Sequence, residues 1–203
     1  MKNILKNTAI LTAITLIAGT LLGLVFEITK EPIAEAKEKA KQEAYMAVIS
    51  EADSFEEFKE FDADEASKLL KDAGLDKCDV VEAAVAKKGN DNIGGVVTVI
   101  DHEGYGGDIK ISVGILNDGT VKGIEMLEIG ETAGLGMKAT EPEFKEQFKD
   151  KNVPEFVYTK SGASNDNEID ALSGATITTN AVTNGVNSAL VYFANEMGGS
   201  VNE

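Results

Sequence analysis

A hairpin pattern in residues 109–129, IKISVGILNDGTVKGIEMLEI, decides the fold. Residues 109–116 alternate in the way a strand with one buried face does, and residues 121–129 return with further β-branched and apolar side chains. Between them lie Asn117, Asp118 and Gly119, residue types that tight turns favour. The segment therefore predicts two antiparallel strands joined by a short turn.

Strand signals continue on both sides of this hairpin. Residues 80–87 and 95–100 are rich in alanine and β-branched side chains, and the residues between them suit a turn. After the hairpin, clusters of glycine and polar residues indicate turns and loops. There we expect a Gly-rich loop at 130–136, a short strand at 156–160 and a polar loop at 161–168.

Four other segments have apolar residues at the spacing, or the end residues, that are typical of helices. Pro32 is expected to open a helix over 33–49, and a second helix from Asp64 is expected to end at Gly74. Helices are also predicted at 141–150 and 178–195. The last carries an apolar stripe for packing on the sheet, formed by Val182, Val186, Ala189, Leu190 and Phe193. Together these segments predict an α+β fold: a twisted, mostly antiparallel sheet packed against helices.

The N-terminal stretch predicts a membrane anchor. Residues 8–26, TAILTAITLIAGTLLGLVF, contain no charge and would span roughly 28 Å as a helix, about the thickness of a bilayer core. A removed secretory signal peptide is the alternative, although its apolar core is normally shorter. The expected division is a cytoplasmic N-terminus at 1–7, an anchor at 8–29, a helical membrane-proximal segment at 30–75 and the main domain at 76–203. Lysines on both sides of the apolar run leave the orientation open on charge alone.

Composition excludes several classes of function. Thirty-five acidic against 19 basic residues give a formal charge of -16, which would repel nucleic-acid phosphates. One cysteine and one histidine cannot build a histidine-based zinc site, an iron-sulfur site or a CxxCH haem attachment. No metal site is therefore expected. We predict that Cys78 is a small, half-buried residue and that His102 ends a strand without a chemical role.

A short motif precedes the last predicted helix: Asp170-Ala-Leu-Ser173-Gly174-Ala175-Thr176. A turn of small residues leading into a helix places unpaired backbone N–H groups and the positive end of the helix dipole beside the Thr176 hydroxyl, which suits a phosphate. The alternative is plain helix capping by Ser173, Thr176 or Thr178.

The stretch DALSGATITTNAV resembles the flavinylation signature of the FMN-binding domain family, found in the G subunit of the Rnf electron-transport complex and in the C subunit of the sodium-translocating NADH:quinone reductase. In that family a flavin transferase uses FAD to attach FMN, through its phosphate, to the last threonine of the motif. The resemblance implies that Thr176 is the attachment residue and Asp170 the motif's acid. It also places Ser173, Gly174, Ala175 and Thr178 at the cofactor.

A second element supports the resemblance. GYGGDIKI from Gly104 and ETAGLG from Glu131 are similar to the family's glycine-rich strand and its ETPGLG loop, with Ala133 in place of the usual proline. The resemblance implies that Glu131, Thr132, Leu135 and Gly136 approach the flavin ring. Tyr105 is expected to be a partly buried packing residue, with stacking on flavin as the alternative.

Together with the predicted anchor, the resemblance implies a membrane-anchored electron-transfer subunit with covalent FMN, in an ion-translocating ferredoxin:NAD⁺ oxidoreductase complex of the Rnf type. Its implied partners are the other subunits of the complex, a flavin transferase and the membrane. The implied location is the cell (inner) membrane, crossed once, with the main domain on the extracytoplasmic side. Three alternatives remain at this point: a stand-alone covalent-FMN protein of an extracytoplasmic chain, the quinone-reductase C subunit, and an acidic anchored module without cofactor.

Overall fold

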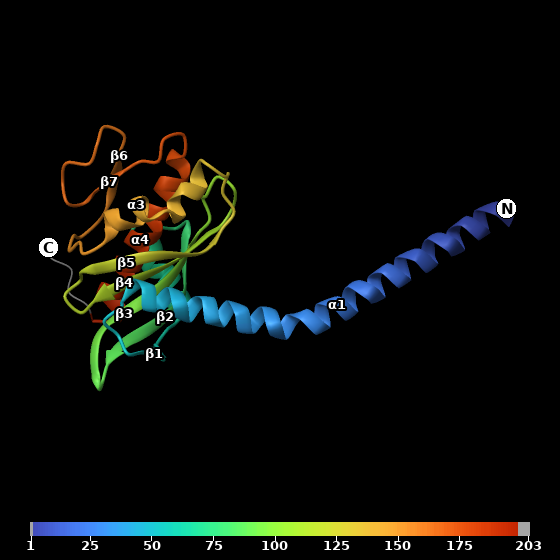
Figure 1. Ribbon diagram of the computed structural model, residues 1–203, viewed down its shortest axis with the longest axis horizontal. Coiled ribbons are helices and arrows are strands. Elements are labelled where there is room, and N and C mark those ends of the chain that lie inside the picture. The colour runs from blue at the N-terminus through green and yellow to red at the C-terminus, as the bar shows by residue number, and fades with distance from the viewer. Residues whose placement is uncertain (1, 199–203) are drawn as a thin grey trace. The chain divides into compact units, whose positions relative to one another are not determined.

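A computed structural model describes residues 2–198, and the chain divides into two compact units, residues 1–41 and 42–203. Helix α1 (Lys2–Val48) begins in the first unit and ends in the second (Figure 1). The apolar residues of its uncharged stretch are exposed, as Leu11, Leu16 and Leu22 show. By length and composition alone, α1 is able to cross a membrane.

The helix runs without a break through Pro32, where the sequence predicted a new helix to open. Proline removes one backbone donor and normally interrupts a helix. The residues around Pro32 are exposed, so solvent can bond the carbonyl that loses its donor. The two predicted helices are consequently one.

Five antiparallel strands form the sheet of the second unit, in the order β1-β2-β3-β4-β5 (Figure 1). They are β1 (Ser54–Glu57), β2 (Cys78–Lys88), β3 (Asp91–Asp101), β4 (Ile109–Leu116) and β5 (Val121–Ile129). The two hairpin strands have the predicted bounds, β2 and β3 are longer than predicted, and β1 was not predicted. The expected α+β fold with a mostly antiparallel sheet is confirmed.

One face of the sheet carries the main core. Helix α4 (Thr176–Glu196) lies on it, and the predicted stripe on this helix is fully buried. Alternate residues of β3 and β4, such as Val97 and Ile111, meet the helix. Helix α2 (Ala63–Asp72) packs beside them. Its N-terminus is capped by Asp62, which accepts from the amides of Asp64 and Glu65.

The end of α1 covers the opposite face of the sheet, where Tyr45, Val48 and Ile49 are buried. Gly114 makes this close approach possible, because a methyl group there would lie 2.7 Å from the Val48 carbonyl oxygen. The Tyr45 hydroxyl lies 3.3 Å from that of Thr98 on β3. The last turns of α1 are thus part of the folded domain.

The remaining elements connect β5 to α4. They are η1 (Gly136–Thr140), α3 (Pro142–Lys145), η2 (Glu146–Phe148), β6 (Val157–Thr159) and β7 (Glu168–Asp170). The helix predicted over 141–150 is therefore too long: α3 makes one turn, and the left-handed Asp150 ends the segment. Strand β7, which pairs in parallel with β6, was also missed.

Candidate cofactor site

A cavity of about 600 Å³ lies where the loop after β5 meets the start of α4. This volume is within the range of small-molecule sites. Most of its lining consists of residues that the sequence motifs single out: Glu131, Thr132, Leu135, Gly136, Gly174, Ala175, Thr176 and Thr178. Two motifs that lie about forty residues apart in the chain thus form one cavity.

The loop wall of the cavity is tightly packed. The Glu131 side chain is only 8% exposed, and its Oε1 accepts a hydrogen bond of 3.2 Å from the Gly106 amide. Gly136 has no space for a side chain, because a Cβ atom there would lie 2.5 Å from Glu131 Oε2 and 2.6 Å from Thr178 Oγ1. Glycine at this position brings the backbone of η1 against the start of α4.

Helix α4 begins without a side-chain cap. Its N-cap residue is Ala175, and no side-chain hydrogen bond caps this end of the described helix. The preceding turn is made by Gly174 in a left-handed conformation, with φ 74°. The capping roles considered for Ser173, Thr176 and Thr178 are therefore wrong. The backbone N–H groups of the first turn and the positive end of the helix dipole lie beside Thr176, at the cavity.

Thr178 carries an unpaired polar atom. Its side chain is 1% exposed, and among the described residues Oγ1 has no hydrogen-bond partner. Leaving a buried hydroxyl unpaired typically costs about 1–3 kcal/mol. The same residue lines the cavity. A buried hydroxyl without a protein partner among the described residues therefore lies in the cavity wall.

Apolar side chains form the outer wall. Tyr105, Leu135 and Ile177 line the cavity and are 71%, 44% and 52% exposed. The expectation that Tyr105 is partly buried was wrong, because its turn lies at the rim of the cavity. Ile177 was missed, although a large apolar residue in the uncapped first turn of a helix is the signal that could have found it.

Two predicted residues lie outside the lining. Ser173 is exposed in the turn before α4. Asp170 ends β7, and its Oδ1 accepts from the Ala163 amide at 2.6 Å. Its own backbone amide donates to Gln147 Oε1. Asp170 therefore organises the chain that leads to the motif and does not line the cavity.

Among residues 2–198 no group of three or more His, Cys, Asp and Glu side chains is arranged to hold a metal ion. The Cys78 side chain is buried, not half-buried as expected, and its thiol donates to Asp101 Oδ2 at 3.2 Å. Burial raises the pKa of this thiol far above its usual range. Cys78 is thus a protonated core residue away from the cavity.

Two family models match the chain. Residues 104–191 match the FMN-binding domain, and residues 1–48 match the RnfG N-terminal region. The first of these matches contains both walls of the cavity.

Curated relatives match almost the whole chain. The G subunit of the Na⁺-translocating ferredoxin:NAD⁺ oxidoreductase complex of Acetobacterium woodii is 30% identical over 197 residues, covering 96% of this chain and 93% of the relative. The G subunit of the proton-translocating ferredoxin:NAD⁺ oxidoreductase complex of Clostridium ljungdahlii is also 30% identical, with 97% and 95% covered. Among solved structures, the C subunit of the Na⁺-translocating NADH-quinone reductase of Parabacteroides distasonis shares the fold, with a TM-score of 0.54 and 22% identity over 78% of this chain and 90% of that one.

Proposed function

Because the chain belongs to the family of G subunits of the Rnf ion-translocating oxidoreductase complexes, we propose that it is an electron-transfer subunit that carries FMN in an ion-translocating ferredoxin:NAD⁺ oxidoreductase. The main support is the cavity, in which the loop after β5 and the start of α4 meet. The proposed partners are the other subunits of such a complex.

The cavity residues fit FMN in three respects. The uncapped start of α4 offers backbone donors and a favourable dipole to a phosphate group. Leu135, Ile177 and Tyr105 offer an apolar wall to a flat ring. The Thr178 hydroxyl in the cavity wall has no partner within residues 2–198, and a hydrogen bond with FMN would satisfy it. Bound FMN supplies the capacity to accept and release electrons, and the chain holds and orients it.

We further propose that the flavin is attached covalently at Thr176. The step forms a bond between Thr176 Oγ and the phosphorus of the FMN phosphate. With FAD as donor, that phosphorus loses its bond to the AMP oxygen, AMP leaves, and the threonine hydroxyl gives up its proton. A flavin transferase would carry out the step. Its product is a phosphodiester whose remaining negative charge lies at the start of α4, where the helix dipole stabilises it.

For the membrane we propose that residues 8–29 form a single-pass anchor, with residues 1–7 in the cytoplasm and the FMN-binding domain, residues 76–203, on the extracytoplasmic side. The exposed apolar surface of this part of α1 supports insertion into lipid. Residues 30–41 then join the anchor to the folded unit, to which residues 42–75 contribute the end of α1, β1 and α2. Co-purification with integral membrane subunits tests membership of a complex, and purification of the chain alone from native membranes would contradict it.

The attachment site has a matched control within the chain. Ser161-Gly162-Ala163-Ser164 repeats the small-residue pattern of the motif, but the Ser164 hydroxyl donates to Glu168 Oε2 and does not line the cavity. We expect Thr176→Ala to abolish flavin fluorescence of the denatured band in a gel and Ser164→Ala to retain it. Both variants must be made in cells that also produce the flavin transferase. A fluorescent Thr176→Ala band would move the linkage to another residue.

A further inference from the structure

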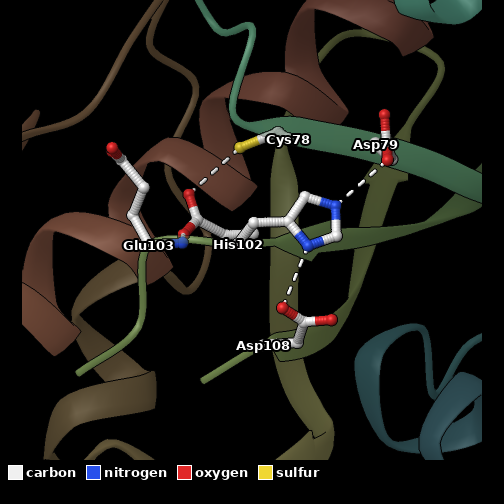
Figure 2. A network of polar contacts seen from close by, with 6 residues as sticks. Cys78, Asp79, His102, Glu103 and Asp108 are labelled. Atoms are coloured by element: carbon white, nitrogen blue, oxygen red, sulfur yellow. Dashed lines mark hydrogen bonds and ion pairs between the residues drawn. The ribbon is translucent and has the colours of Figure 1, made fainter. Parts of the chain in front are cut away.

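A turn carries Tyr105 to the rim of the cavity, and its two ends are tied together by one side chain. His102 lies just before the turn, Asp108 just after it, and Asp79 lies on the neighbouring strand β2 (Figure 2). His102 Nδ1 lies 3.0 Å from Asp108 Oδ1, and Nε2 lies 3.0 Å from Asp79 Oδ2. We call these three residues the His102 bridge.

The bridge requires a particular charge state of the ring. A carboxylate only accepts hydrogen bonds, and a neutral imidazole has one N–H to donate. Both contacts are therefore hydrogen bonds only when both ring nitrogens carry a proton. A neutral ring keeps one of the two and loses the other.

The turn between these ends is held separately at its tip. The Gly106 amide donates to Glu131 Oε1, and a methyl group at Gly106 would overlap the Gly130 carbonyl oxygen. At the base, the Glu103 amide donates to the buried Asp101 Oδ1 at 2.7 Å. Any movement of the turn therefore reaches Glu131 and the cavity wall directly.

We propose that His102 is a positioning residue for the flavin cavity: in its doubly hydrogen-bonded form it ties the turn that presents Tyr105 to β2, and loss of its proton loosens that turn. The inference rests on the proposed function, in that it takes the cavity to be the flavin site. No sequence pattern predicts this role for His102, because Asp79 and Asp108 come beside its ring only in the folded chain.

The charges around the ring favour the protonated form. Hydrogen bonds with Asp108 and then Asp79 raise the pKa of His102 above its ordinary value of 6.5. The titratable residues beside the ring come from three places along the chain. They are Asp76 and Lys77 just before β2, Cys78 and Asp79 at its start, Asp101 and Glu103 beside His102, and Asp108 and Lys110 around the start of β4. Lys77 is itself paired with Asp76. The acids outnumber the bases here, so these charges favour the protonated ring and act in the same direction as the two hydrogen bonds.

The test uses the full chain without flavin, made in cells that lack the transferase, in detergent. His102 is the sole histidine of the sequence, so ¹³C-labelled histidine gives one imidazole signal. Hydrogen exchange at the Gly106 amide, corrected for intrinsic rates, reports the turn. We expect its protection to fall about two- to fivefold as pH rises, the effect of losing an exposed charged contact. The midpoint should coincide with that of the imidazole signal.

Three variants test whether the His102 bridge causes the fall in protection of the Gly106 amide. Asp108→Asn should lower both midpoints together, and His102→Gln should remove the pH step. Asp166→Asn, which changes an exposed partner of Lys151 in another loop, should leave both curves unchanged. Protection that stays constant through the His102 titration, or a step that survives in His102→Gln, would overturn the proposal. These measurements use chain without flavin, so their outcome does not depend on whether Thr176 carries FMN. A failure of the proposed flavin attachment would be seen separately, in the Thr176→Ala experiment.

Discussion

Replacing Gly136 with alanine tests whether the cavity wall is as tightly closed as its geometry indicates. Gly136 does not have a positive φ, so alanine meets no backbone restriction there. Its Cβ atom would lie 2.5 Å from Glu131 Oε2, 2.6 Å from Thr178 Oγ1 and 2.8 Å from Glu131 Cβ. Ordinary contacts need about 3.5–4.0 Å between carbons, so both neighbours must move by roughly 1 Å.

The expected cost is that of an overpacked core, about 1–3 kcal/mol. For a domain of this size it corresponds to a fall in the unfolding midpoint of about 2–12 °C. Flavin incorporation should fall as well, because the displaced groups are the ones that line the cavity. A loss of about 1 kcal/mol in the free energy of flavin binding lowers the binding constant roughly fivefold.

The assay compares Gly136→Ala with Gly130→Ala, a glycine in the same loop. A Cβ atom at Gly130 would lie 3.6 Å from the Gly106 carbonyl oxygen, an ordinary contact, so the change should stay within about 0.5 kcal/mol. Thermal unfolding and flavin absorbance per chain are measured for both variants, co-produced with the transferase. Equal midpoints and equal flavin content in the two variants would refute the reasoning.

Three further outcomes follow from the fold. Asp62→Ala removes the two hydrogen bonds that cap α2 and should cost about 0.5–2 kcal/mol in urea unfolding, whereas an unchanged midpoint would show the cap to be dispensable. The Cys78 thiol, whose pKa is raised by burial, should react with a thiol reagent only after denaturation, and fast labelling of the folded chain would contradict its burial. Hydrogen bonds with Asp108 and then Asp79 raise the pKa of His102 in the folded chain. The bridge therefore contributes its full share to the free energy of unfolding below about pH 6.5, and that share is lost as pH rises through the folded pKa. The difference in unfolding midpoint between the native chain and His102→Gln should shrink as pH rises above about 6.5, and a difference that stays constant would argue against it.

Much of the fold could be predicted because its decisive segments satisfy local and global demands at once. The hairpin over 109–129 has strand alternation and turn residues in agreement, and its bounds are correct. Strand β1 escaped prediction because its four residues, SFEE, lie at the sheet edge, where the burial that shapes a strand pattern is slight. Helix α1 continues through Pro32 because exposed backbone there can bond water in place of the lost donor.

The site was harder to predict where it depends on contacts that only the fold creates. The two motifs were found separately, and the glycine at position 136 is what allows them to meet. No local pattern reveals that Thr178 keeps a buried, unpaired hydroxyl while Thr179 bonds the Leu172 amide and the Ala175 carbonyl. The rim position of Tyr105 likewise depends on the packing of its turn against Glu131.

Mass spectrometry of the chain, co-produced with the flavin transferase, tests the central claim most directly. Trypsin leaves Ser164 and Thr176 on one peptide, because no lysine or arginine follows Lys160. Cleavage before Asp166 and Asp170 separates them. We predict that the peptide beginning at Asp170 carries the mass of FMN less one water, with fragment ions that place it on Thr176. The same peptide unmodified, in a sample whose flavin is lost on denaturation or found on another peptide, would contradict attachment at this threonine.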